Sequence, residues 1–507
     1  MLLHILVLAP FVAALLIALA GSKGYSSRLP LFLASCFVSF SVALIALGDV
    51  STTPLPWFKL PGSEASVTYH LGTYTLNAWL VFLSCILTLA SLVSARTYYK
   101  KEYKNFAIGL FVLLGTMNGA FLALDAVLFF FFFEAMVIPA AILIASYGNE
   151  KAKSGAMTFA IYTLIGSLPM ALALFYMVAK SGSTTSFVLF EFVQKLNPET
   201  QTLLTVSFLI AFLVKTPVFP FHGWQAITYI QAPAPVSAIL TGAMSKVGVY
   251  GILIWVLSIF PNNPVIDKVM LILALITAIY GALIALRAKD IKKVLAFSSM
   301  GHLGLAVAVI FTFSPKMLPA VLVLLVAHGL SAGGLFLLSG FVSRAAKTRD
   351  ITQMGGFTST NPIFAFFFGL LSIIALSVPG TAGFVGEFLS LSALFDVGPL
   401  PAVVGGLCLI LSAAYMLRLV QCVLFGTPKT ERTLKFAHLE GFIIGIFAFC
   451  SLLFGLHPAF IYEVRVNPET EIVDSQNMEN SSVLTEEETK KMIDEMTLAD
   501  STEVSHD

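Results

Sequence analysis

Long apolar runs, separated by short polar connections, occupy most of the chain. A helix needs about 20 apolar residues to cross the hydrocarbon core of a bilayer, and many of the runs come close to that length. The runs lie near residues 2–20, 29–48, 77–95, 106–123, 126–147, 155–179, 203–221, 233–259, 265–287, 291–313, 317–342, 362–394, 401–425 and 436–456. The pattern predicts an all-α polytopic membrane protein with about fourteen transmembrane helices in one compact body.

The distribution of basic residues predicts the orientation of these helices. Lys and Arg near the ends of membrane spans favour the cytoplasmic face, and they gather in the odd-numbered connections, although Lys180 and Lys195 are exceptions. Both termini are therefore expected on the extracytoplasmic side of a multi-pass protein in the cell inner (plasma) membrane. The first apolar run has no basic residue ahead of it and is long enough to span, which favours a retained helix over a cleaved signal.

Composition narrows the possible functions further. Of 507 residues, 58% are hydrophobic and 11% charged, with a formal net charge of +1, which excludes a soluble domain and argues against a nucleic-acid partner. The five cysteines have no metal-ligand spacing, and no nucleotide, flavin or quinone fingerprint is present. We therefore expect no cofactor and no metal in this chain. The phenylalanine run 129–133 favours packing or lipid contact over a quinone slot.

Four charged residues stand inside these apolar runs: Glu134, Lys215, Lys246 and Glu387. A charge near the bilayer centre costs about 2.5–3.5 kcal/mol even on lenient scales. Buried ion pairs rarely repay their desolvation, so a purely structural role explains four such residues poorly. The four residues indicate an ion path, with Glu134 facing Lys215 as a switchable pair. Burial favours the neutral form of a lysine, and a nearby carboxylate favours the charged form.

Proline interrupts two of the spans close to these charges. Pro217 and Pro220 follow Lys215, and Pro379 precedes Glu387. Broken helices at membrane depth are how many transporters build ion sites. Each break falls fourth in a run of five spans, which predicts two inverted five-helix repeats. The predicted segments are three N-terminal helices in 1–105, repeats at 106–259 and 265–425, a last helix in 426–457 and an acidic extracytoplasmic tail, 458–507, with a capping box from Thr485 to Glu488.

Three histidines could relay protons between the fixed charges. His222, His302 and His328 all lie in or beside apolar runs, and imidazole exchanges protons near neutral pH. A lone histidine in a membrane helix is as often a hydrogen-bonded packing residue. Three in one predicted band favour a relay that carries a proton from Lys246 toward Glu387.

Several stretches around these residues resemble one known family, the antiporter-like membrane subunits of complex I and of Mrp-type cation/proton antiporters. The matching stretches are LDAVLFFFFFEAMVIP, KTPVFPFHGW, APAPVSAILTGAMSKVGVYG, DIKKVLAFSSMGHLG, AHGLSAGGLFLLSG and PGTAGFVGEF. The resemblance implies that Glu134 and Lys215 form an ion pair, that Lys246 is the central proton carrier, and that Glu387 is the terminal exchange group. His302 and His328 would lie on the connecting axis.

Within that family, the glutamate of GFVGEF resembles the chain M or subunit 4 type from the middle of the complex I membrane arm. This implies a proton-translocating subunit of an NADH:quinone oxidoreductase, a translocase without redox chemistry of its own. NADH, FMN, iron-sulfur clusters and quinone would be bound by partner subunits of the peripheral and membrane arms. An Mrp-type Na⁺/H⁺ antiporter subunit and an ion-coupled bicarbonate uptake module are the alternatives, and the driven ion, H⁺ or Na⁺, stays open.

One segment departs from the family pattern. Family members usually have Leu-Pro-Asp-Ala-His after the His-x-Trp motif, whereas this chain has Gln-Ala-Ile-Thr-Tyr from Gln225 to Tyr229. The acid and the histidine are missing, so the proton entry route inferred from relatives lacks two of its groups here and stays open. The departure would fit a divergent complex.

Overall fold

The computed structural model describes residues 1–20, 26–59, 65–429 and 435–462, which form a mostly helical body. The acidic tail beyond Tyr462, with the expected capping box at Thr485, lies outside the described residues. Twelve helices of the described chain are long and apolar enough to cross a membrane. The predicted multi-pass helical architecture is therefore confirmed.

The twelve membrane-length helices include two composites, one of two pieces and one of five. They are α1 (Leu2–Leu19), α2 (Leu29–Leu47), α3 (Thr75–Tyr98), α4 (Tyr103–Leu122), α5 with α6 (Ala126–Ala135 and Val137–Tyr147), α7 (Ala152–Ser181), a composite of α11 (Ala234–Ile239), η1 (Leu240–Met244), α12 (Lys246–Gly251), η2 (Ile252–Val256) and α13 (Leu257–Ile259), α14 (Pro264–Arg287), α15 (Ile291–Ile310), α16 (Met317–Ala346), α20 (Pro399–Leu424) and α21 (His438–Leu456).

The other two predicted spans are each present as a pair of shorter helices. They are α9 (Pro198–Lys215) with α10 (Gly223–Gln231), and α18 (Pro362–Ala375) with α19 (Ala382–Val397). The total of fourteen spans and the inverted repeats stay predictions. Short helical elements occupy the connections and the end of the described chain: α8 (Ser186–Gln194), η3 (Ile351–Gln353), α17 (Phe357–Thr360) and α22 (Ala459–Tyr462).

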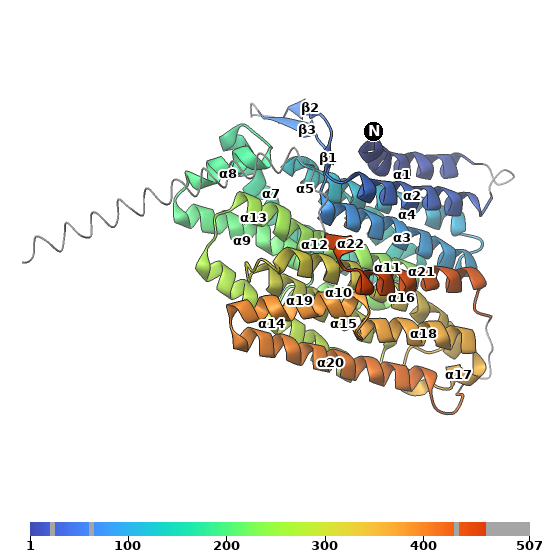
Figure 1. Cartoon of the computed structure of the whole chain (residues 1–507). Coiled ribbons are helices and arrows are strands. Elements are labelled where there is room, and N and C mark those ends of the chain that lie inside the picture. Colours follow the sequence, from blue (N-terminus) through green and yellow to red (C-terminus); the bar gives the residue numbers. More distant parts are fainter. Residues whose placement is uncertain (21–25, 60–64, 430–434, 463–507) are drawn as a thin grey trace, which may run out of the picture. The chain divides into compact units, whose positions relative to one another are not determined.

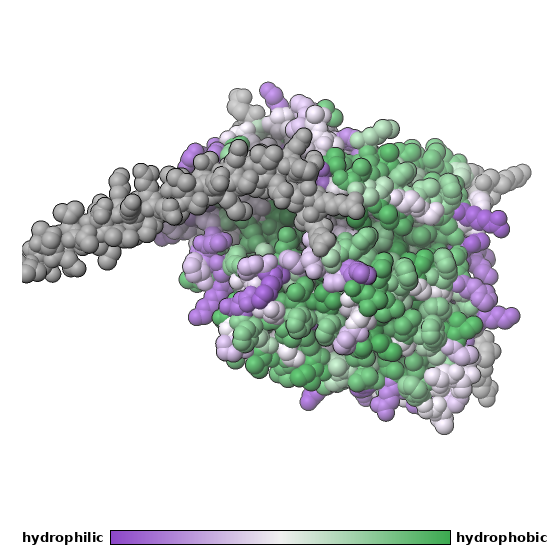
Figure 2. Space-filling view, in the orientation of Figure 1, coloured by the Kyte–Doolittle hydropathy of each residue, from purple (hydrophilic) through white to green (hydrophobic). Residues whose placement is uncertain are grey.

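The helices divide into a buried centre and an apolar periphery (Figure 1). α3, the α11–α13 composite, α15 and α16 are almost wholly covered by other helices, whereas most residues of α1, α2 and α20 are at least partly exposed. Exposed side chains on the outer helices are mainly Leu, Ile and Phe. Figure 2 shows a largely hydrophobic face with hydrophilic residues gathered toward the two ends of the helices. Such a surface suits hydrocarbon in the middle and water at both ends.

Both predicted breaks are present, and each has a local cause. α9 ends at Lys215 because Pro217 and Pro220 cannot continue the ladder of backbone hydrogen bonds. α18 ends at Ala375, and the chain turns through Gly380 at φ +94° before Thr381 caps α19 by accepting a hydrogen bond from the Phe384 amide.

The sequence did not predict a third break, between α5 and α6. The helices meet at Met136, two residues after Glu134. Pro139 lies in the first turn of α6 and lacks the N–H that the carbonyl of Ala135 would need for a continuous helix. A charged residue therefore lies beside a break here too.

Two small antiparallel ladders lie between α2 and α3, where no strands were predicted. β1 (Val50–Ser51) pairs with β4 (Gly72–Thr73), and β2 (Leu55–Lys59) pairs with β3 (Ser66–Tyr69). Asp125 ties this region to the helices: its carboxylate accepts hydrogen bonds from the Thr68 amide and hydroxyl at 3.0 and 2.8 Å, and from the hydroxyl of Thr184. The same carboxylate caps the first turn of α5.

Candidate functional site

Lys246 lies in the most irregular of the buried helices. It is the first residue of α12, between the π-helical segments η1 and η2. Such segments are frequent at functional sites because they change the direction of side chains and free backbone groups. The Lys246 ammonium is fully buried and donates a hydrogen bond to the carbonyl oxygen of Thr241 at 3.0 Å.

The second contact of Lys246 crosses to α16. Its Nζ lies 3.2 Å from Nδ1 of His328, which is buried. A pair of glycines permits this approach, because small residues let membrane helices come close. A Cβ at Gly329 would lie 2.8 Å from the carbonyl oxygen of Gly242, so a larger side chain there would push α16 away from η1.

From His328 the polar groups continue to α15 and α19. The rings of His328 and His302 are 5.4 Å apart between centroids. His302 Nδ1 lies 3.5 Å from Oε1 of Glu387, and both side chains are about nine-tenths buried. Nε2 of His328 is buried and has no hydrogen-bond partner among the described residues. Lys246, His328, His302 and Glu387 therefore form one line of neighbouring titratable groups, which we call the central line.

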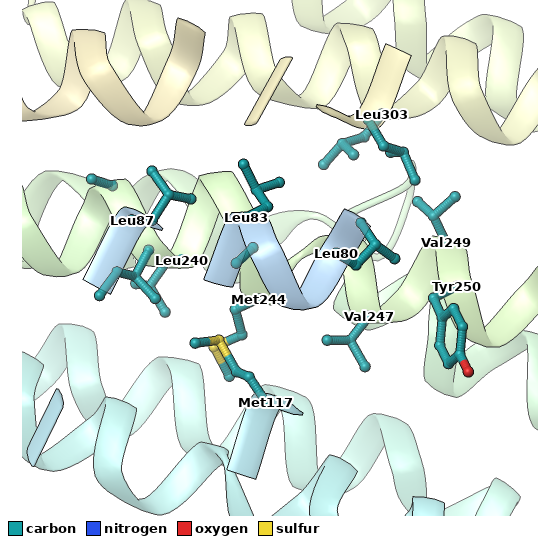
Figure 3. Packing of buried hydrophobic residues seen from close by; sticks show 14 of the residues in the cluster. Leu80, Leu83, Leu87, Met117, Leu240, Met244, Val247, Val249, Tyr250 and Leu303 are labelled. Carbon is teal, nitrogen blue, oxygen red and sulfur yellow. The ribbon is translucent and has the colours of Figure 1, made fainter. Parts of the chain in front are cut away.

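Apolar side chains pack around the helices that carry the start of this line (Figure 3). Leu83 and Leu87 of α3 fit against the backbone of Gly329 and Gly242, where a Cβ would come within 2.3 Å of a leucine methyl. Met244 and Val247, on either side of Lys246, belong to the same buried cluster. Leu83 and Leu87 therefore cover the close contact between η1 and α16, next to the Lys246–His328 pair.

Glu134 and Lys215 form a second charged cluster. Lys215 is buried, and its Nζ lies 4.7 Å from the centre of the Phe133 ring. The polar side chains that act on the half-buried Glu134 are Lys215, through its charge, and the nearby hydroxyl of Ser167. Within the described chain, neither Lys215 Nζ nor Glu134 Oε2 has a hydrogen-bond partner, and no direct ion pair within 4.0 Å joins them. The expected close pair is thus open in this structure.

His222 lies apart from the other two histidines. It precedes α10 in the broken span, and its ring contacts Tyr280 and Phe219 at centroid distances of 5.0 and 5.7 Å. The structure therefore brings together four of the seven predicted residues in the central line, places Glu134 near Lys215, and leaves His222 in an aromatic cluster.

Hydroxyl groups that the sequence reasoning missed lie next to the central line. Thr241 Oγ1 donates to Ser299 Oγ at 2.7 Å, and Ser245 Oγ donates at 3.0 Å to the same Thr241 carbonyl that binds Lys246. Their signal in the sequence was weak, since Ser and Thr are common in membrane helices. In the described residues, no group of three or more His, Cys, Asp or Glu side chains could hold a metal ion.

Comparison with known proteins places these residues in a family. The family model described as NADH:quinone oxidoreductase/Mrp antiporter, TM, matches residues 123–412, which include all seven predicted site residues. The chain is 33% identical over 412 residues to NADH-quinone oxidoreductase subunit M of Rickettsia prowazekii (strain Madrid E), covering 80% of this chain and 83% of the relative.

Solved structures agree with this comparison. A chain of respiratory complex I from Thermus thermophilus with bound NADH matches with a TM-score of 0.82 and 29% identity, covering 91% of this chain and 96% of that one. A chain of the Mrp complex from Dietzia sp. DQ12-45-1b matches with a TM-score of 0.77 over 91% of this chain and 95% of its own, at 20% identity. The second likeness shows a shared fold alone.

Proposed function

Because the chain belongs to the NADH:quinone oxidoreductase/Mrp antiporter family of membrane subunits, we propose that it is a proton-translocating membrane-arm subunit of a complex I-like NADH:quinone oxidoreductase. Relatives that bear the name subunit M support this assignment. In this proposal, electron transfer takes place in other subunits, and this chain moves protons in response.

The observation that carries the proposal is the central line. Lys246, His328, His302 and Glu387 come from four different elements, yet each lies beside the next. Charged and ionisable groups at membrane depth are expensive, and a connected series is the arrangement that proton relays use. A stability role alone would require pairs with satisfied hydrogen bonds, whereas Nε2 of His328 is left without a partner in the described chain.

The geometry suggests how a proton would pass. Lys246 gives its proton to Nδ1 of His328, which releases another from Nε2 toward His302, directly or through one water. His302 then passes a proton to Glu387. Imidazole suits both middle positions because it binds a proton on one nitrogen while releasing one from the other.

The open cluster of Glu134 and Lys215 supplies a means of coupling in this proposal. Closing the gap would favour the charged form of Lys215, and widening it would favour the neutral form. In this proposal, a change in the charge of Lys215 acts on Lys246 electrostatically, because α9 and α12, which carry the two lysines, pack closely together. Gly248 permits this packing, since a Cβ there would lie 2.7 Å from the carbonyl oxygen of Phe212.

The partners and the location follow from the same assignment. We propose that other membrane-arm and peripheral subunits bind this chain and that these partner subunits hold NADH, FMN, iron-sulfur clusters and quinone. The assembly would lie in the plasma membrane, with both termini of this chain outside the cytoplasm. Loss of an Mrp-type antiporter would instead cause sodium or lithium sensitivity, and loss of a bicarbonate carrier would reduce uptake. No feature of the described site favours either alternative.

Replacing Lys246 by Met tests the proposal. The side chain keeps its length but cannot carry a proton, so NADH-driven proton translocation by the reconstituted complex should fall to the level seen without NADH. Lys268→Met, which changes an exposed lysine on α14, is the control and should translocate at the wild-type rate. Assembly is followed by subunit composition. Full translocation by an assembled Lys246→Met complex would refute the proposed role.

A further inference from the structure

Beside Lys246, on the side of α10, lies a group of buried polar side chains that are not titratable at neutral pH. We propose that Gln225, Tyr229, Thr241, Ser245 and Ser299 enclose ordered water and form the path by which protons reach Lys246. We call this group the hydroxyl chamber. The inference rests on the proposed function and identifies the uptake side of the same site.

Two side chains of the chamber come from α10, and each has a polar atom that lacks a hydrogen-bond partner in the described part of the chain. Gln225 and Tyr229 are both fully buried. Gln225 donates from Nε2 to the carbonyl oxygen of Ala296 at 3.1 Å, but its Oε1 and the Tyr229 hydroxyl have no hydrogen-bond partner among the described residues. Side chains one helical turn apart share a helix face, so the two groups point to the same region.

The facing walls come from η1, Ser245 and α15. Ser245, Gln225 and Thr241 are the polar side chains nearest the Tyr229 hydroxyl, and none of them meets the geometry of a direct hydrogen bond to it. Thr241 Oγ1 is bonded to Ser299 Oγ, and the Thr241 carbonyl accepts from both Ser245 Oγ and Lys246 Nζ. The chamber therefore touches the central line at its first member.

Buried polar atoms in folded proteins nearly always have a partner, and where protein atoms do not supply one, an ordered water does. A carbonyl oxygen, a phenol and a serine hydroxyl that face one another without direct bonds provide the two to four partners that a buried water needs. Each hydroxyl can accept a proton from its neighbour on the uptake side while it donates its own proton to the next group toward Lys246. Because the Thr241 carbonyl that Ser245 and Lys246 share can only accept hydrogen bonds, the proposal assigns the last transfer to an ordered water, which gives a proton to the neutral Lys246 amine and takes one from the hydroxyl next to it.

Polar side chains surround the C-terminal end of α10. The Ile230 carbonyl accepts from Arg349 Nη1 at 2.8 Å and from Asn149 Nδ2 at 2.9 Å, and Lys292 Nζ donates to the carbonyl of Ala232. Arg349 also pairs with Asp290 at 3.1 Å, with both side chains partly exposed. In this proposal water enters at the partly exposed Arg349 and Asp290, on a surface that the predicted orientation makes cytoplasmic.

The chamber also accounts for the departure of this chain from the family pattern. Tyr229 stands where family members usually have the histidine of Leu-Pro-Asp-Ala-His. A phenol in that place replaces a titratable ring with a hydroxyl that can pass a proton but does not hold a charge at neutral pH. The ring itself is fixed by Trp224 and by Phe336, whose ring centroids lie 6.0 and 5.7 Å away.

The test compares three variants of the assembled complex in proteoliposomes. Tyr229→Phe removes one hydroxyl and should slow NADH-driven proton translocation about tenfold, as expected for the loss of one essential hydrogen bond. Tyr229→His should restore it, because imidazole can also relay a proton. Tyr250→Phe is the control. It removes an equally buried hydroxyl, which donates to the Phe121 carbonyl oxygen at 2.8 Å and is not part of the chamber, and it should leave the rate unchanged.

A second measurement covers the case in which Tyr229→Phe does not assemble. A high-resolution map of the wild-type complex should show water within hydrogen-bond distance of Tyr229 Oη and Gln225 Oε1, and a dry contact there would overturn the inference. So would a wild-type rate in assembled Tyr229→Phe, or equal loss in Tyr250→Phe. If Lys246→Met pumps normally, the proposed function itself fails; if only Tyr229→Phe does, the chamber alone is refuted.

Discussion

At the scale of single residues, the buried charges differ in how completely their hydrogen-bonding capacity is used. Asp125 accepts from two threonine side chains and three backbone amides, so both of its carboxylate oxygens have several hydrogen-bond donors. Glu387 and Lys215 have far fewer contacts. A buried polar group without partners costs stability, so an incompletely satisfied one is a candidate for function and a satisfied one for structure.

Asp125 should therefore be a structural residue. In Asp125→Asn the new amide group points N–H donors at the donors of Thr68 or Thr184, and we expect the free energy of unfolding to fall by about 3 kcal/mol. Thermal unfolding of the purified complex measures the change. Asp396→Asn, which alters an exposed carboxylate paired with Lys316, should leave the unfolding temperature near the wild-type value. Equal stability of the two variants would contradict this account of Asp125.

The residues of the central line could be predicted from the sequence, but their contacts could not. A charge in an apolar run is conspicuous because lipid tolerates it so poorly, which is why Lys246 and Glu387 were identified. Their neighbours His328 and His302 lie on other helices, and no spacing within the chain encodes a distance between helices. Asp125 was missed because it stands at the end of a span, where a carboxylate is common. Tyr229 was noted only as a departure from the family.

At the scale of elements, every predicted charge lies on or near an irregular helix. Glu134 precedes the break at Met136, Lys215 ends α9, Lys246 lies between two π segments, and Glu387 follows the turn at Gly380. Proline announced two of these irregularities, because it lacks an N–H. The π segments around Lys246 contain no proline and pack against α3, α9 and α16, so they could not be predicted from the residues of their own span.

The contact between α9 and α12 depends on Gly248. A Cβ in Gly248→Ala would lie 2.1 Å from Thr216 Oγ1 and 2.7 Å from the carbonyl oxygen of Phe212; the hydroxyl can rotate away, but the backbone cannot. We expect a loss of about 2 kcal/mol in unfolding free energy, typical of overpacking. Thermal unfolding and the yield of assembled complex report the effect.

Gly406→Ala is the matched control for this substitution. Gly406 lies in the exposed helix α20, and a Cβ there meets nothing within 4 Å. Because alanine favours helix over glycine, stability should stay the same or rise by up to about 1 kcal/mol. A Gly248→Ala protein as stable as Gly406→Ala would show that α9 and α12 are not held at this distance.

At the scale of the whole molecule, the buried helices carry the chemistry and the outer helices face lipid. Lys246, His302 and His328 lie on the α11–α13 composite, α15 and α16, which are almost wholly covered. Hydropathy predicted this helical architecture because a membrane imposes one length and one composition on every span. It could not predict the ladders β1–β4 and β2–β3, which are short and lie in a connection that the membrane does not constrain.

The most direct test of the central line compares two buried carboxylates. Glu387 and Glu440 are equally buried, each with 7% of its surface exposed, but only Glu387 lies beside His302. We predict that reconstituted complex with Glu387→Gln assembles and loses NADH-driven proton translocation, while Glu440→Gln translocates at the wild-type rate. Retained translocation in Glu387→Gln, or the same loss in both variants, would contradict the proton path through Lys246, His328, His302 and Glu387.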